Sequence, residues 1–264
     1  MAPARTPKHP PGLSARTLAI ATRAHRALGD RRAGIQTEWV RALTGASLES
    51  IGSVVAELED LLEIEAEIRR RHLGGGRPHY AQIRAPFELY ALTRLVRPDH
   101  IVETGVSSGV SSAHFLLGLR KNRHGHLHSI DRPTFQRGAE FHPEESPVTL
   151  PPGEASGWAI PPALRRGWDL RLGASEALLP ALVAELPTIG IFLHDSLHTP
   201  AHLTFELETV RPKLLAGAVV LADNTAWTGA SFPRFARRLG VPVVPRGRSD
   251  LVGLRSPSRA PPGL

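Results

Sequence analysis

Polar and ionisable side chains recur along this chain just after short apolar runs, where strands of a sheet would end. They are Glu103, Asp131, Ser175, His194, Asp195, Asp223 and Asn224. In open α/β sheets, ligands bind beyond the carboxyl ends of the strands. The sequence therefore predicts one site that is assembled from several strand ends.

The stretch from His100 to Pro133 has the order strand, glycine turn, helix, strand and acid. Gly105 allows a sharp turn off the first strand, and Gly109 allows the backbone to come close to a ligand above the turn. Free N–H groups at the start of the following helix favour a carboxylate or a phosphate. Asp131, at the end of the second strand, could accept hydrogen bonds from both hydroxyls of a ribose. This order is typical of a nucleotide-binding βαβ unit.

The spacing of the turn also bears on which nucleotide binds. Dinucleotide sites prefer G-x-G-x-x-G with a pyrophosphate on the helix start, and Ser107 stands where that pattern has its second glycine. Glu103 adds negative charge beside the turn, which suits a cationic ligand better than a pyrophosphate. Two plainer interpretations stay open: Glu103 only caps the turn, or Asp131 only pairs with Arg132.

At these residues the chain resembles the class I S-adenosylmethionine-dependent methyltransferases, whose first motif has the form E/D-x-G-x-x-x-G. The run F-L-H-D-S-L-H from Phe192 to His198, followed later by Asp223 and Asn224, is similar to methyltransferase family 24. That group includes sugar and antibiotic O-methyltransferases. The resemblance covers roughly residues 84–256 and implies a Rossmann-like α/β fold, with seven mostly parallel strands and helices on both faces.

The resemblance implies S-adenosylmethionine as cofactor, with its ribose on Asp131. Ser175 resembles the family position near the adenine, and it is also a candidate N-cap of the next helix. Trp158 either covers the cofactor or anchors its own loop. The predicted cofactor-binding residues are Glu103, Gly105, Ser107, Gly109, Asp131, Ser175 and His194.

Asp195, Asp223 and Asn224 carry the hard oxygen ligands that Mg²⁺ prefers, so the sequence predicts a divalent-cation site there. The alternative is that the two aspartates cap neighbouring helices. His198 is the candidate general base, because the ordinary pKa of histidine, about 6.5, suits proton removal near neutral pH. Asp195 is the second candidate catalytic residue.

Three histidines spaced by four residues, His194, His198 and His202, resemble a zinc site on one helix. Pro200 argues against that interpretation, because it is the expected first residue of the helix, with Thr199 as its cap. The three imidazoles would then lie on a strand end, a loop and a helix. A zinc site is not expected.

Hydrophobic periodicity predicts the elements that hold these residues. The expected strands are Ile101–Val102, His126–Ile130, Trp168–Leu172, Ile189–Leu193, Ala218–Ala222, Pro242–Pro245 and Leu251–Leu254. The expected helices of this domain are Pro86–Val96, Val110–Leu119, Ser175–Leu186, Pro200–Lys213 and Phe232–Leu239. Alternation of strands and helices predicts a mostly parallel sheet with both faces covered.

Ahead of this domain, residues 13–83 are expected to form a helical extension, with helices at Leu13–Leu28, Arg31–Leu43 and Ser47–Arg71. The apolar stripe of the longest helix must be buried, either in a homodimer contact or over the acceptor side of the site. Disordered tails are expected at residues 1–12 and 257–264. The connection at residues 132–167 is far longer than usual, which predicts a functional flap or a disordered segment.

Composition excludes several classes. A chain of 264 residues with 41% apolar residues suits one α/β domain with a helical appendage. It has no cysteine, no apolar stretch of membrane-spanning length and no signal-peptide core, so a soluble, cytoplasmic protein without disulfides is expected. The net charge of +7 raises nucleic acid as a partner, but aromatic residues are only 5% and do not alternate with basic ones. A solvated basic surface is the favoured interpretation.

The leading interpretation is an S-adenosylmethionine-dependent O-methyltransferase acting on a small molecule such as a sugar or natural product. Three alternatives stay open: a nucleic-acid methyltransferase or binder, a non-catalytic protein with the same fold, and a nicotinamide-dependent dehydrogenase. The polar residues at all the strand ends argue against a non-catalytic protein. The lack of an N/D-P-P-Y run argues against an enzyme that methylates the amino groups of bases.

Overall fold

The computed structural model describes residues 35–74, 85–133, 150 and 153–258. Seven strands form one sheet with the order β3-β2-β1-β4-β5-β7-β6. Strands β1 to β5 pair in parallel, whereas β7 runs antiparallel to both of its neighbours. The strands are β1 His100–Thr104, β2 His126–Asp131, β3 Trp168–Leu172, β4 Ile189–His194, β5 Leu214–Ala222, β6 Val244–Pro245 and β7 Val252–Arg255. The predicted Rossmann-like fold class is confirmed.

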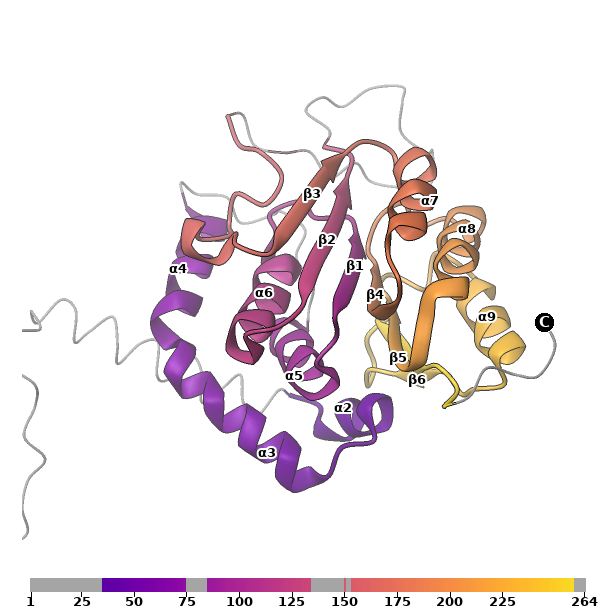
Figure 1. The fold of residues 1–264 in the computed structure, drawn as a ribbon, viewed down its shortest axis with the longest axis horizontal. Helices are drawn as coiled ribbons and strands as arrows, with labels where there is room; N and C mark the ends of the chain where they lie inside the picture. Colours follow the sequence, from indigo (N-terminus) through magenta and orange to yellow (C-terminus); the bar gives the residue numbers. More distant parts are fainter. Residues whose placement is uncertain (1–34, 75–84, 134–149, 151–152, 259–264) are drawn as a thin grey trace, which may run out of the picture.

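Alternate residues of the strands supply two separate apolar cores, because successive side chains of a strand point to opposite faces of the sheet. Ile101 of β1 belongs to the core under α5 (Pro86–Val96) and α6 (Val110–Asn122). Its neighbour Val102 belongs to the core under α7 (Ser175–Glu185), α8 (Pro200–Val210) and α9 (Ser231–Leu239). Figure 1 shows these two helical layers on either side of the sheet. Within the part of the chain that the structure describes, no helix is long and apolar enough to cross a membrane.

Most element bounds fall within a few residues of the expectation, and β5 is the clearest exception. It begins at Leu214 rather than Ala218, because Leu214 pairs with Ile189 ahead of a register shift in β4. Leu215 and Ala216 are exposed, and Gly217 separates them from the apolar run that begins at Ala218.

The described part of the N-terminal extension contains α2 (Thr37–Thr44), α3 (Leu48–Ala56), the 3₁₀ helix η1 (Glu57–Leu61) and α4 (Leu62–Leu73). The single helix expected over residues 47–71 is therefore wrong. The interruption begins at Glu57, whose carboxylate accepts hydrogen bonds from Arg94 (2.7 Å) and Tyr90 (2.6 Å) of α5. The expected N-terminal tail, the helix Leu13–Leu28 and much of the expected flap lie outside the described residues, as does most of the C-terminal tail.

The apolar stripe of the extension is buried against the same chain. Ile51, Val54, Leu58 and Ile68 belong to one core with residues of α5 and α6. Figure 1 shows α3 and α4 wrapped around the outside of α5 and α6. The described helices of the extension thus have no core of their own, and they cover one helical layer of the sheet.

Candidate functional site

The turn between β1 and α6 depends on two glycines in the left-handed region, since Gly105 and Gly109 both have φ of 84°. A Cβ atom on Gly105 would lie 1.9 Å from the backbone oxygen of Asp195, so only glycine lets the turn pass this close to the end of β4. Ser107, between them, also has a positive φ of 48°. The predicted glycine positions are places where the backbone makes a close approach.

Asp131 ends β2 and lies against this turn, with only 9% of the residue exposed. One carboxylate oxygen accepts a hydrogen bond from the backbone N–H of Val106 at 3.0 Å. The other accepts a hydrogen bond from the hydroxyl of Ser156. The strand-turn-acid unit predicted from the sequence is therefore present.

Glu103 is fully buried beneath the turn, on the α6 face of the sheet. It accepts hydrogen bonds from the hydroxyls of Ser111 (2.5 Å) and Ser112 (2.6 Å) in the first turn of α6, and from Ser129 of β2 (2.8 Å). Burial raises the pKa of this carboxyl to about 7 despite the three hydrogen bonds, which lower it. Glu103 ties β1, β2 and α6 together below the turn, and any influence on a ligand is indirect.

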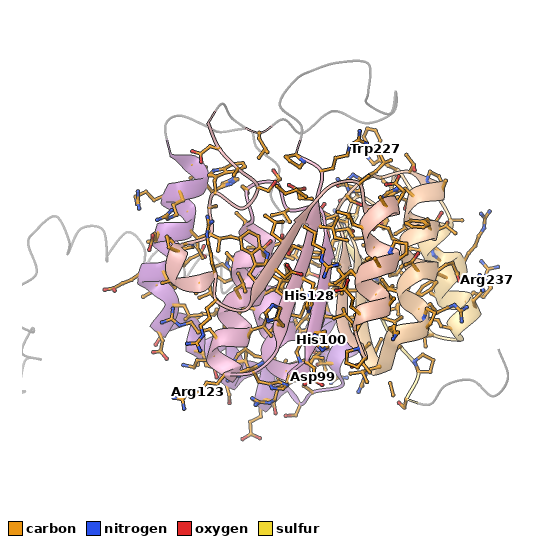
Figure 2. All side chains as sticks on the ribbon, turned by 45° about the horizontal axis from the view of Figure 1, so that its top comes forward. Asp99, His100, Arg123, His128, Trp227 and Arg237 are labelled. Atoms are coloured by element: carbon orange, nitrogen blue, oxygen red, sulfur yellow. The ribbon has the colours of Figure 1, made fainter. Side chains whose placement is uncertain are left out.

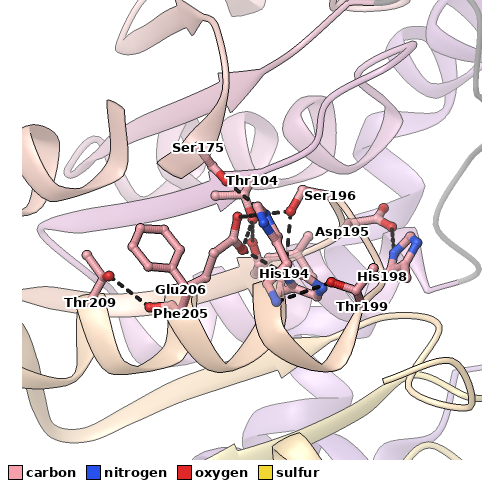
Figure 3. Close-up of polar contacts among 12 residues, drawn as sticks. Thr104, Ser175, His194, Asp195, Ser196, His198, Thr199, Phe205, Glu206 and Thr209 are labelled. Carbon is pink, nitrogen blue, oxygen red and sulfur yellow. Dashed lines mark hydrogen bonds and ion pairs between the residues drawn. The ribbon is translucent and has the colours of Figure 1, made fainter. Parts of the chain in front are cut away.

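A second buried glutamate, Glu206 of α8, lies on the opposite face of the sheet (Figure 3). Its carboxylate accepts hydrogen bonds from Thr104 (2.6 Å), His194 (2.7 Å), Ser196 (2.9 Å) and His202 (2.9 Å). Burial alone would raise the pKa of Glu206. The charges and hydrogen bonds of His194 and His202 outweigh burial and hold that pKa far below its ordinary value.

The network extends from Glu206 to α7. Nε2 of His202 lies 2.9 Å from the Ser175 hydroxyl, and Nδ1 lies 3.0 Å from a carboxylate oxygen of Glu176. Burial lowers the pKa of His202, but its interactions with Glu206 and Glu176 raise the pKa above its ordinary value. Ala174 is the N-cap of α7, so the predicted capping role of Ser175 is wrong. Its hydroxyl bonds to an imidazole instead of a backbone N–H.

The three histidines lie on three different elements, as Pro200 predicts. His194 ends β4, His198 lies in the loop after it, and His202 lies in α8 behind the cap Thr199. His194 is fully buried and faces Glu206. The ring of His198 meets that of His194 edge to face, with the centroids 5.6 Å apart, and its Nε2 lies 3.5 Å from Asp195 Oδ1.

The acidic residues after β4 and β5 lie at neighbouring strand ends, because these two strands pair directly. Burial raises the pKa of Asp223 to about 6, and the negative charges of Asp195 and Asp250 raise it in the same direction. Asn224 follows with a positive φ of 51°. Among the described residues, no group of three or more His, Cys, Asp or Glu side chains is placed to hold a metal ion. The candidate set here is two carboxylates and one amide.

Several residues of the site were missed from sequence, chiefly Glu206 and Ser156. A signal for Glu206 exists: it is an acid four residues after His202, on the helix face that carries Leu203, Leu207 and Val210 into the core. No comparable signal marks Ser156, which lies in the long connection after β2.

Comparison with known proteins adds to this geometry. Residues 102–225 match the model of methyltransferase family 24, described as a methyltransferase domain. No curated protein matches the chain.

Two solved structures share the fold. The O-methyltransferase TomG from Streptomyces achromogenes, involved in tomaymycin synthesis and solved in complex with S-adenosylmethionine, is 19% identical with a TM-score of 0.51; the match covers 78% of this chain and 96% of that one. The O-methyltransferase NovP is 14% identical with a TM-score of 0.53, over 89% of this chain and 99% of that one. At such identities the likeness concerns the fold. The family match extends from β1 to the residues after β5, so this segment of the chain is similar to the methyltransferase domain of family 24.

Proposed function

We propose that this protein transfers the methyl group of S-adenosylmethionine to a hydroxyl group of a small molecule such as a sugar or natural product. The observation that carries the proposal is the strand order β2-β1-β4-β5. In this order the glycine turn after β1 neighbours the loop after β4, which carries Asp195 and His198, while Asp131 ends the strand on one side of this pair and Asp223 follows the strand on the other. TomG and NovP, which share the fold, are O-methyltransferases, and this supports oxygen as the acceptor atom.

On the cofactor side, the carboxylate of Asp131 would accept hydrogen bonds from the ribose, and the turn from Gly105 to Gly109 would bring its backbone close to the cofactor. Ser175 would lie near the adenine. The contributions of Glu103 and His194 are indirect, because both side chains are fully buried and bonded within the protein. They hold β1 and β4 in the positions from which the other residues act.

On the acceptor side, methyl transfer from a sulfonium is an in-line displacement, so the protein must orient the hydroxyl and remove its proton. His198 is the proposed base. Its side chain is 12% exposed, and the nearby Asp195 carboxylate orients the imidazole and stabilises its protonated form. The exposed indole of Trp227, in the turn after Asn224, lies at the same edge of the sheet (Figure 2).

A divalent cation, with Mg²⁺ the proposed ion, fits the residues at the ends of β4 and β5. Burial and, after it, the negative charge of Asp195 raise the pKa of Asp223, and a cation held by both carboxylates would offset their repulsion. Asn224 supplies a neutral oxygen. When bound, such an ion lowers the pKa of an acceptor hydroxyl.

Calorimetry with S-adenosylhomocysteine and with NAD tests the cofactor proposal. The wild type is expected to bind the first and not the second. Asp131→Ala should weaken binding by about 1.5–3 kcal/mol, the scale of hydrogen bonds to a charged group. Asp99→Ala is the matched control, because Asp99 is an exposed aspartate at the start of β1, on the opposite edge from Trp227 (Figure 2). Equal affinity of all three proteins would contradict the assignment of Asp131.

Thermal unfolding with Mg²⁺ and with a chelator tests the cation proposal. Without the ion, Asp223→Asn should melt above the wild type, because it removes the repulsion between the carboxylates. With the ion, only the wild type should gain stability. A wild type whose melting temperature changes with neither Mg²⁺ nor the chelator would contradict the proposed cation site.

A further inference from the structure

Residues 156–160, which we name the strap, lie directly on the glycine turn. The N–H of Gly157 donates to the backbone oxygen of Ser107 (2.8 Å), and the N–H of Ala159 donates to that of Ser108 (2.9 Å). The Ser156 hydroxyl donates to the carboxylate of Asp131. Three hydrogen bonds thus join the strap to residues of the proposed cofactor site.

The strap packs closely on the turn. A Cβ atom on Gly109 would lie 2.8 Å from the Cα of Gly157 and 2.8 Å from the side chain of Ile160. A Cβ on Gly157 would in turn lie 2.4 Å from the ring of Trp168. Since not even a methyl group fits at these two positions, no part of a ligand can enter between the strap and Gly109 unless the strap moves.

The same arrangement leaves polar groups of the turn unsatisfied. Within the described residues, the hydroxyls of Ser107 and Ser108 are buried without a hydrogen-bond partner, although buried hydroxyls are nearly always paired. The carboxylate of Asp131 meanwhile has both oxygens engaged, one by Val106 and one by Ser156. The strap therefore engages the Asp131 carboxylate, an acceptor of the proposed cofactor site, while the hydroxyl groups of Ser107 and Ser108 stay unpaired.

The N-terminal extension braces the strap from outside. The indole of Trp158 stacks on the imidazole of His72 in α4, with ring planes 13° apart and centroids 6.5 Å apart. Both residues are buried, at 7% and 4% exposure. Displacement of the strap would have to break this contact as well.

We propose that Ser156 is a gating residue of the cofactor site. Its hydroxyl donates to the same carboxylate oxygen of Asp131 that would accept a hydrogen bond from a ribose hydroxyl, and the strap moves away from the turn when the cofactor binds. The proposal rests on the proposed function, in which Asp131 receives the ribose. The closed strap lowers the apparent affinity for cofactor by the fraction of molecules that are open. A variant that weakens the closed form should bind more tightly.

The test compares the affinity of S-adenosylhomocysteine for the wild type and for Ser156→Ala in the full chain. Loss of about one hydrogen bond from the closed form should lower the Kd roughly fivefold to tenfold. The matched control is Ser53→Ala, which removes an exposed serine hydroxyl of α3 that bonds only to its own helix, and its Kd should be unchanged. An unchanged or raised Kd in Ser156→Ala would overturn the gate.

Hydrogen exchange on the wild type gives a second measurement that needs no variant. The amides of Gly157 and Ala159 are donors only in the closed strap, so S-adenosylhomocysteine should speed their exchange. Slower exchange would show that the strap closes over the cofactor, and unchanged exchange with bound ligand would show that the strap does not move. Either result would overturn the proposed gate but not the proposed function. A wild type that binds no S-adenosylhomocysteine overturns the proposed function itself.

Discussion

Two glutamates on opposite faces of the sheet, both fully buried at its carboxyl edge, are held in different ways. Glu103, under the turn between β1 and α6, accepts hydrogen bonds from three serine hydroxyls, and burial raises its pKa to about 7. Glu206, on the other face, accepts hydrogen bonds from two hydroxyls and two imidazoles, and its pKa is far below the ordinary value. The difference shows that neutral hydrogen-bond donors do not offset the desolvation of a buried carboxylate, whereas a charged partner does.

This contrast divides the edge of the sheet into two environments. Under the turn, a buried cluster of Glu103 and three serines, in which the pKa of the carboxyl is raised to about 7, lies below the place proposed for the cofactor. Beside it, an ionic cluster around Glu206 holds the start of α8 and the end of β4, from which the loop with Asp195 and His198 departs. Five substitutions should break or sharpen the contrast.

The largest expected effect is that of Glu206→Gln. The substitution breaks the buried pairs that Glu206 forms with the imidazoles of His194 and His202, which should lower the free energy of unfolding at neutral pH by about 3–5 kcal/mol. Urea unfolding of the wild type and the variant measures this change in the free energy of unfolding. Because the pKa of Glu206 is lowered on folding, its stabilisation exists above the unfolded pKa of about 4.5 and is lost as the pH falls below it.

Glu176→Gln is the control for that change. Glu176 contacts the same imidazole of His202, but its side chain is 53% exposed, so the loss should be below about 1 kcal/mol. Equal losses in the two variants would mean that the ionic cluster does not depend on the buried charge.

Glu103→Gln should have an intermediate effect that depends on pH. The folded pKa of about 7 lies above the unfolded value of 4.5, so folding favours the protonated carboxyl and its contribution to stability falls as the pH rises between these values. Relative to the variant, the wild type should lose on the order of 3 kcal/mol between about pH 4.5 and pH 7.5. Urea unfolding at several pH values checks this, and parallel curves for the two proteins would contradict it.

The smallest effects are expected from single hydroxyls on the two faces. Thr104→Val removes a hydrogen bond to an ionised carboxylate and should cost about 1.5–3 kcal/mol. Ser112→Ala removes a hydrogen bond to the Glu103 carboxyl, which is largely protonated near pH 6. This change should lower the free energy of unfolding by about 0.5–1.5 kcal/mol at that pH. A larger loss of unfolding free energy in Ser112→Ala than in Thr104→Val near pH 6 would contradict the difference between the two glutamates.

What could be predicted from the sequence concerns features that depend on neighbours along the chain. The glycine turn with Asp131 two elements later follows from local composition, and so does the start of α8 at Pro200 behind Thr199. The pairing of β4 with β5, which brings Asp195 and Asp223 together, follows from the rules of parallel α/β sheets. The first two predictions succeeded because they depend on backbone conformations that few residue types allow, and the third because few topologies suit a parallel sheet.

The remainder was decided by tertiary contacts. The donors to Glu206 come from β1, β4, the loop after β4 and α8, and no periodicity along the chain places them around one carboxylate. Glu57, where the 3₁₀ interruption begins, is bonded to Arg94 in another helix, and Ser156 of the strap is bonded to Asp131, 25 residues away. A buried polar group takes whichever donors folding brings within reach, so its partners, its pKa and its role are properties of the packed structure.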